Sequence, residues 1–311
     1  MSPAGLGGQR WPFVALLTMT AVWGSTFFLI KDIVTRIPVP DLLTVRFAIA
    51  TIALATMAAG HLKMSRRILA RGLVLGLLYG TAQLLQTAGL DHTAASVSGF
   101  LTGLYVVATP LLAAWILRTA ISSNAWLASV LATVGLAVLS LHGFAIGYGE
   151  LLTCVAALIY AGHIIALGQL SKPGEALSLS VIQLSMITAV CAVGAVASGG
   201  SRPLISLPAT GLDWLIVVYL AVVASAVTMV LQTWAQARVE PSRAAVVMAM
   251  EPVWAAAFAI ALGGETMTVR MIIGGLAIVA AMYLVMRSSA ERGVRSLENR
   301  LDAHASDLRS R

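Results

Sequence analysis

Long apolar runs recur along the whole chain, and each is bounded by charged residues, proline or glycine. A helix of about 20 apolar residues crosses the hydrocarbon core of a bilayer, and charged, proline or glycine clusters are common helix boundaries. The pattern therefore predicts an all-α integral membrane protein with ten transmembrane helices. The predicted spans are Trp11–Ile33, Leu42–Ala59, Ile68–Leu90, Ala95–Leu117, Ala125–Leu141, Gly149–Leu170, Leu177–Ala197, Trp214–Ala235, Arg243–Gly263 and Val269–Met286.

The composition argues against a soluble protein. Of the 311 residues, 59% are hydrophobic and 11% are charged, and the mean hydropathy is +0.90. A single soluble core has too little interior to bury so many apolar runs. The net charge of +7 does not indicate nucleic-acid binding, because the basic residues cluster between apolar runs and near the C-terminus. Cys154 and Cys191 lie inside apolar runs with no metal-ligand spacing, so no disulfide, metal or cofactor is predicted.

The distribution of lysine and arginine predicts the orientation. With the N-terminus in the cytoplasm, 15 of the 20 basic residues fall on the cytoplasmic side, 4 fall outside, and Arg46 lies within a helix. Because cytoplasmic loops are enriched in basic residues, we expect both termini inside, with a flexible N-terminus at residues 1–10 and a charged tail at residues 288–311. The expected location is the plasma membrane, which in a bacterium is the inner membrane.

A weak internal repeat accompanies the ten spans. Leu85-Gln86-Thr87 recurs as Leu231-Gln232-Thr233, 146 residues later, and the same offset aligns Tyr105 with Glu251. The third and fourth predicted helices then correspond to the eighth and ninth, so each repeat has five helices. Because five is odd, the second repeat enters the membrane with the opposite sense, and inverted repeats place a substrate site between the two units near the midplane. The predicted repeats occupy residues 11–141 and residues 142–287.

Several short motifs follow one another in a characteristic order. They are Trp23-Gly24-Ser25, the stretches Pro40–Arg46 and Thr93–Ser98, and Glu251-Pro252 followed by Gly264-Glu265. Together they resemble the drug/metabolite transporter superfamily of the EamA type, over nearly the whole of residues 11–286. The resemblance implies two inverted five-helix repeats, alternating access and, in many members, export of amino acids or other metabolites. The stretch Phe100–Tyr105 resembles the branch that includes aromatic amino-acid exporters, whereas Tyr160-Ala161-Gly162 stands where that family commonly has a tryptophan.

Glu251 is the foremost candidate for a functional residue. It lies about eight residues into the predicted ninth helix, hence roughly 12 Å deep at 1.5 Å per residue. An ionisable group at that depth is a candidate for substrate or proton binding, although a protonated glutamate can also hold helices together through hydrogen bonds. Pro252 and Trp254 follow it and are consistent with a local break in the helix.

Three predicted helices carry polar side chains along one face. The stripes are Tyr79, Gln83 and Gln86 in the third helix, Ser98, Thr102, Tyr105 and Thr109 in the fourth, and Ser225, Thr228, Gln232 and Gln236 in the eighth. Such stripes suit the walls of a water-filled cavity for a zwitterionic or aromatic solute, although single polar residues also bridge helices. The predicted substrate-binding residues are Trp23, Tyr79, Gln83, Gln86, Thr102, Tyr105, Tyr160, His163, Gln232 and Glu251.

Arg46 lies four residues inside the predicted second helix. We expect its long side chain either to reach the outer interface or to form a structural ion pair with Asp41 or Glu265.

Motifs for enzymatic chemistry do not occur in the sequence. It has no P-loop, HExxH or GxSxG, so neither ATP-driven transport by this chain nor catalysis is indicated. The leading hypothesis is a secondary transporter or facilitator that exports amino acids or related small metabolites. The alternatives are efflux of cationic or hydrophobic drugs, a membrane-embedded enzyme and a structural membrane protein.

Overall fold

Apolar runs form helices throughout the part of the chain that the structure describes. This computed structural model describes residues 10–93, 95–118, 123–140, 147–198, 205–263, 268–269, 272–281 and 283–284. The helices are α2 (Trp11–Gly24), α3 (Phe27–Ile33), α4 (Val39–Met57), α5 (Arg66–His92), α6 (Ala95–Gly103), α7 (Tyr105–Leu117), α8 (Ser123–Ser140), α9 (Tyr148–Leu170), α10 (Ala176–Ser198), α11 (Gly211–Ala221), the π-helical segment η1 (Val222–Val227), α12 (Thr228–Gln236), α13 (Pro241–Met248), α14 (Glu251–Gly263) and a further helix, Ile272–Ala281. No strand occurs among these described residues.

Six helical segments are long and apolar enough to cross a membrane. They are Trp11–Ile33, Val39–Met57, Arg66–His92, Tyr148–Leu170, Ala176–Ser198 and Gly211–Gln236. Shorter apolar helices are Leu101–Leu117, Trp126–Gly135 and Ile272–Ala281. The predicted all-helical, multi-pass membrane protein is therefore confirmed, while the number of ten crossings stays a prediction.

Three of the predicted helices are interrupted, and two of the breaks lie in the fourth and ninth helices. The span Ala95–Leu117 is divided at Leu104 into α6 and α7, directly after Gly103, which is a weak helix former. The ninth predicted helix is divided into α13 and α14, with Glu251 as the first residue of α14. Pro252 lacks the N–H that would bond to the carbonyl of Met248, which explains the second interruption. The predicted local break at Glu251 and Pro252 is thus confirmed, whereas the continuity predicted for Ala95–Leu117 is wrong.

The first predicted helix is also interrupted, between α2 and α3. The Ser25 hydroxyl donates to the Val22 carbonyl at 2.7 Å and the Thr26 hydroxyl donates to the Trp23 carbonyl at 2.8 Å. Hydroxyl groups that bond to the preceding turn compete with the backbone ladder and bend helices. These two hydroxyl bonds lie at the break between α2 and α3.

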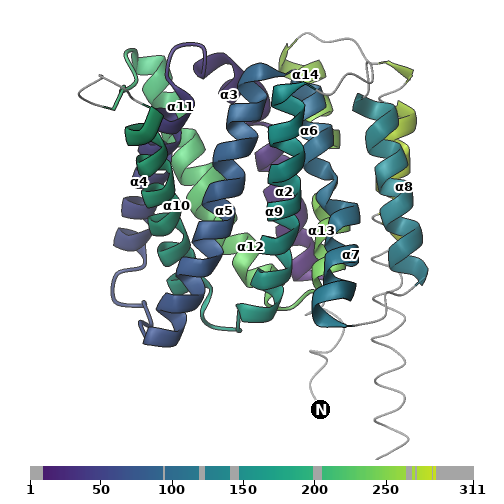
Figure 1. Cartoon of the computed structure of the whole chain (residues 1–311), viewed down its shortest axis with the longest axis horizontal. Coiled ribbons are helices and arrows are strands. Elements are labelled where there is room, and N and C mark those ends of the chain that lie inside the picture. The colour runs from purple at the N-terminus through teal and green to yellow at the C-terminus, as the bar shows by residue number, and fades with distance from the viewer. Residues whose placement is uncertain are drawn as a thin grey trace, which may run out of the picture.

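The packing centres on long helices that contact one another along much of their length. Helix α5 packs against α9 and α10, α10 also packs against α4, and α2 contacts α12 and α14. In Figure 1, α2 lies within the bundle behind α5 and α9, whereas α8 lies at its edge. There α8 approaches the helix Ile272–Ala281 closely, since a Cβ on Gly135 would lie 2.7 Å from the Gly274 carbonyl oxygen. The fifth predicted span therefore lies at the edge of the bundle.

Polar contacts fasten the end of the bundle opposite the N-terminus (Figure 1). The Lys31 ammonium donates to the carbonyl oxygens of Leu90 at 2.8 Å and Thr93 at 3.0 Å, so α3 caps the end of α5. Arg36 bridges Asp32 at 2.7 Å and Asp213 at 2.8 Å, which joins α3 to α11. These two carboxylates, Asp32 foremost, raise the pKa of the Arg36 guanidinium above its ordinary value. These contacts fix α3 against its neighbours.

Some sequence predictions fall on residues outside the described ranges. The charged tail at residues 288–311 and Glu265 lie there, as do residues 1–9 of the predicted N-terminal segment.

Candidate functional site

A cavity lies inside the helix bundle and encloses about 640 Å³ of space, counting the part that is open to solvent. Nine of the ten side chains predicted to bind substrate line it. They are Trp23, Tyr79, Gln83, Gln86, Thr102, Tyr105, Tyr160, Gln232 and Glu251. They come from α2, α5, α6, α7, α9, α12 and α14, so part of each predicted polar stripe reaches one space. The stripe residues Ser98, Thr109, Ser225, Thr228 and Gln236 do not line it.

The cavity has eight further wall residues besides the predicted substrate-binding residues. They are Thr26, Phe27, Ile30, Arg46, Thr87, Leu90, Ile164 and Met248. Arg46 is the important one, because its side chain is only 4% exposed. The predicted reach of Arg46 to the membrane interface is therefore wrong. Among the described residues no carboxylate lies within ion-pair distance of it, so the structure shows no ion pair with Asp41.

A tyrosine and two glutamines form the ordered part of the wall. The Tyr160 hydroxyl lies 3.0 Å from both the Gln83 and Gln86 Oε1 atoms, and it has one proton to donate to them. The Gln83 amide donates to Thr87 at 3.0 Å and the Gln86 amide donates to Thr102 at 3.0 Å. This network ties both glutamines to neighbouring side chains without a ligand, so it fixes the shape of the wall.

The π-helical segment η1 and the start of α12 hold two other wall residues through polar groups. Its Ala224 carbonyl accepts from the Trp23 Nε1 at 3.2 Å, and the same indole lies 3.2 Å from the Thr228 hydroxyl. Ser225 accepts from the Arg46 Nε at 2.8 Å. Ser225 and Thr228, which the stripe argument placed on the cavity wall, instead hold the wall residues Trp23 and Arg46 in place.

Three wall residues keep polar atoms without a hydrogen-bond partner in the described part of the chain. The Tyr105 hydroxyl and the Gln232 Oε1 are buried and have no such partner. Glu251 is 7% exposed, and its carboxyl forms no hydrogen bond or ion pair with a described residue. Because buried polar groups are nearly always hydrogen-bonded, these three groups are available to water or a solute in the cavity.

His163 does not line the cavity, although it was predicted to bind substrate. Its Nε2 lies 3.1 Å from the Gln183 Oε1 on α10, and its ring meets the Tyr79 ring edge-on, with the centroids 5.2 Å apart. Gln183 also donates to Thr233 at 3.2 Å. His163 therefore belongs to a buried hydrogen-bonded cluster among α9, α10 and α12, behind the cavity wall.

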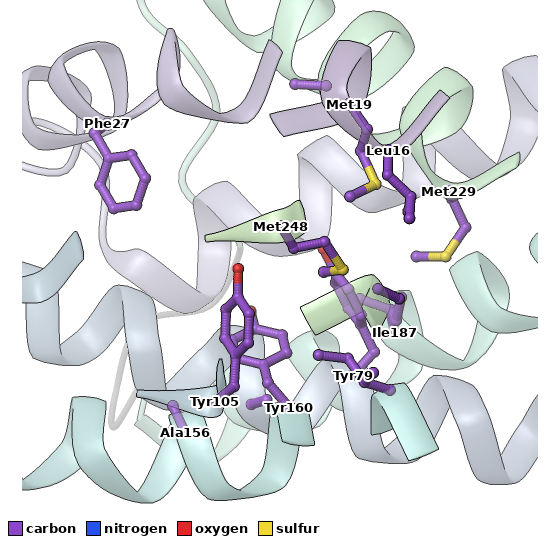
Figure 2. Close-up of a cluster of buried hydrophobic side chains, with 14 of the residues drawn as sticks. Leu16, Met19, Phe27, Tyr79, Tyr105, Ala156, Tyr160, Ile187, Met229 and Met248 are labelled. Carbon is purple, nitrogen blue, oxygen red and sulfur yellow. The ribbon is translucent and has the colours of Figure 1, made fainter. Parts of the chain in front are cut away.

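The cavity extends toward one end of the bundle. Phe27 and Ile30 on α3 and Leu90 near the end of α5 line it there, and that end lies opposite the N-terminus (Figure 1). Toward the N-terminal end, the fully buried side chains of Leu16 and Met19 precede the wall residue Trp23 along α2. In Figure 2, Phe27 lies at the left of the view and Leu16, Met19 and Met229 lie at the right, with Tyr105 and Tyr160 lower and between the two groups. Apolar packing therefore lies between the cavity and the N-terminal end.

Glycine positions the helix that carries Glu251. A Cβ on Gly24 would lie 2.6 Å from the Trp254 Cβ and 2.9 Å from the Glu251 carbonyl oxygen. Only a glycine lets α2 approach the first turns of α14 so closely. The Trp23-Gly24-Ser25 motif thus supplies a wall residue, a close helix contact and a helix break in succession.

A bundle of membrane-spanning helices around a cavity of polar and aromatic side chains defines the class of multi-pass membrane transport proteins. The chain matches the EamA-like transporter family over residues 10–141 and 147–287, and it belongs to that family. An uncharacterized transporter of Archaeoglobus fulgidus is 28% identical over 273 residues, which cover 88% of this chain and 84% of the relative. A crystal structure of a protein with 19% sequence identity superposes with a TM-score of 0.72, covering 90% of this chain and 98% of the other, so the fold is shared.

Membership of a transporter family supports the prediction that the protein is not an enzyme. The protein is therefore a multi-pass membrane transporter, in contact with lipid and with small-molecule substrates.

Proposed function

We propose that this transporter is a secondary transporter or facilitator that exports amino acids or related small metabolites by alternating access. The observation that carries the proposal is the cavity, in which Arg46 and Glu251 lie on the same walls as Trp23, Tyr79 and Tyr105. Charged, amide and aromatic groups together are what a small zwitterionic or aromatic solute requires of a binding site.

The proposed architecture is a pair of inverted five-helix repeats, at residues 11–141 and 142–287, with both termini in the cytoplasm. The separate family matches over residues 10–141 and 147–287 support this division. The helix breaks support it too, because α7 begins at Tyr105 and α14 begins at Glu251, the pair aligned by the repeat. With the N-terminus inside, the cavity extends toward the outer face.

Efflux of cationic drugs is the second candidate function. A buried carboxyl beside aromatic rings favours a cation, and Glu251 shares the cavity with Trp23 and Tyr105. Arg46 on the same cavity opposes it, since an unpaired guanidinium repels a cationic solute. The amino-acid hypothesis accounts for both charged residues.

Uptake and counterflow in liposomes test the proposed function. The purified full-length protein is reconstituted and offered a panel of amino acids and organic cations, with and without a pH gradient. Saturable counterflow of an amino acid supports the proposal. Flux of organic cations alone would replace it with the drug-efflux alternative, and the absence of flux from every panel member, in folded protein, would contradict both.

A further inference from the structure

Arg46 is a buried cation at the wall of the cavity. Its guanidinium is carried by α4, and the residue is 4% exposed. A cation taken out of water is costly unless it is paired or well hydrogen-bonded. The described part of the chain supplies no carboxylate within ion-pair distance of it. Its counter-charge therefore has to come from elsewhere.

The hydrogen bonds of Arg46 use only part of its donor capacity. Nε donates to the Ser225 hydroxyl at 2.8 Å, and Nη2 makes a long contact of 3.4 Å with the Ala224 carbonyl oxygen. The structure gives Nη1 no hydrogen bond with a described residue. A guanidinium has five N–H donors in a fixed planar fork, so an edge suited to a carboxylate is left over.

The π-helical segment η1 holds the guanidinium in position. Ser225 accepts from Arg46 and donates in turn to the Leu220 carbonyl at 2.8 Å, five residues earlier, as π-helical geometry allows. The neighbouring Ala224 carbonyl also accepts from Trp23. Arg46 is therefore fixed at its Nε, while the remainder of the fork is left for a ligand.

Glu251 is the complementary charge in the same cavity. It is 7% exposed and makes no hydrogen bond or ion pair with a described residue, so it does not neutralise Arg46 directly. The Tyr79 and Tyr160 side chains line the same cavity as both charged residues. Tyr105 and Gln232 add unpaired oxygen atoms. The cavity thus offers a donor fork on α4 and a set of oxygen acceptors on α7, α12 and α14.

We propose that Arg46 binds the carboxylate of a zwitterionic solute, that Ser225 positions Arg46 for this contact, and that Glu251 accepts the ammonium group of the same solute. The inference rests on the proposed function and narrows its substrate class to molecules that carry both charges, such as α-amino acids. A solute of this kind supplies the counter-charge that each residue lacks in the protein.

The test compares three ligands that differ in one charged group each. Phenylalanine has both groups, phenethylamine lacks the carboxylate, and 3-phenylpropanoate lacks the ammonium. Their affinities for the purified full-length protein are measured by calorimetry. Charge-assisted hydrogen bonds of 1.5–3 kcal/mol predict that the wild-type protein prefers phenylalanine over phenethylamine by about 10- to 150-fold.

Single substitutions then show which residues cause the preference for phenylalanine. Arg46→Gln should weaken phenylalanine binding and leave phenethylamine within about threefold, so that the preference disappears. Ser225→Ala should lose part of it, because the guanidinium is no longer held at Nε. Glu251→Gln should instead reduce the preference for phenylalanine over 3-phenylpropanoate. Arg238→Gln is the matched control. Arg238 is exposed and lies just after α12, so this substitution removes the same charge outside the cavity.

The outcomes separate the inference from the proposed function. An Arg46→Gln variant that keeps the full preference would overturn the inference while leaving amino-acid transport intact. If that variant does not fold, the affinities of the wild-type protein test the inference. Equal wild-type affinity for phenylalanine and phenethylamine overturns it. If neither phenylalanine nor any other panel member binds folded wild-type protein, the proposed function fails as well.

Discussion

Replacing Gly24 with alanine tests the helix contact that positions Glu251. The added Cβ would lie 2.6 Å from the Trp254 Cβ, 2.8 Å from the Ala255 nitrogen and 2.9 Å from the Glu251 carbonyl oxygen. Backbone atoms cannot rotate away as a side-chain end does, so α2 and α14 have to separate. Overpacking of this kind costs about 1–3 kcal/mol, partly offset by up to about 1 kcal/mol of improved helix propensity.

The control is Gly162→Ala in α9, where an added Cβ meets no atom within 4 Å. That variant gains helix propensity without a clash, so the two variants differ mainly in packing. Apparent melting temperatures of the detergent-solubilised proteins, taken at one scan rate, should place Gly24→Ala several degrees below Gly162→Ala. Gly24→Ala should also weaken solute binding, because α14 carries Glu251. Equal melting temperatures for the two variants would refute the close helix contact.

Three further predictions concern topology and the cavity wall. In a cysteine-free background, a cysteine at Asp91 should be labelled from outside the cell and a cysteine at Gly174 from the cytoplasm. Labelling of both cysteines from one face would disprove the proposed orientation. Tyr160→Phe removes the hydroxyl that both glutamines share and should cost about 1–3 kcal/mol of stability together with solute affinity, measured by thermal unfolding and calorimetry. His163→Gln should lower stability by about 1 kcal/mol and leave solute affinity unchanged, because His163 bonds to Gln183 behind the wall; a loss of affinity without destabilisation would return it to the binding site.

The cavity walls were largely predictable because helical periodicity alone fixes which residues share a face. Tyr79, Gln83 and Gln86 lie within two turns of one helix, and all three line the cavity. Periodicity alone does not place His163, which is three residues from Tyr160 and does not line the cavity. A shift of three residues rotates the side chain by about 60° away from its neighbour, which here is enough to turn it toward α10.

The position of Arg46 was not predictable from its depth along the helix. Four residues from a predicted helix end, a long arginine reaches water in an isolated helix. The structure buries it because α4 starts earlier, at Val39, and because η1 presents Ser225 and the Ala224 carbonyl to it. The segment Val222–Val227 contains no proline, so its sequence does not mark the departure from α-helical geometry. A contact between residues 179 positions apart in the chain leaves no local pattern in the sequence.

The central claim is that the cavity is the path of the solute, and one measurement tests it most directly. Thr26 lines the cavity directly before α3, so Thr26→Cys in a background without Cys154 and Cys191 places a thiol of similar size there. Thr56→Cys, at an exposed position on α4, is the control. We predict that a charged thiol reagent blocks amino-acid counterflow in liposomes only for Thr26→Cys, and that excess substrate slows the modification. Full counterflow after complete modification of Thr26→Cys would contradict the account.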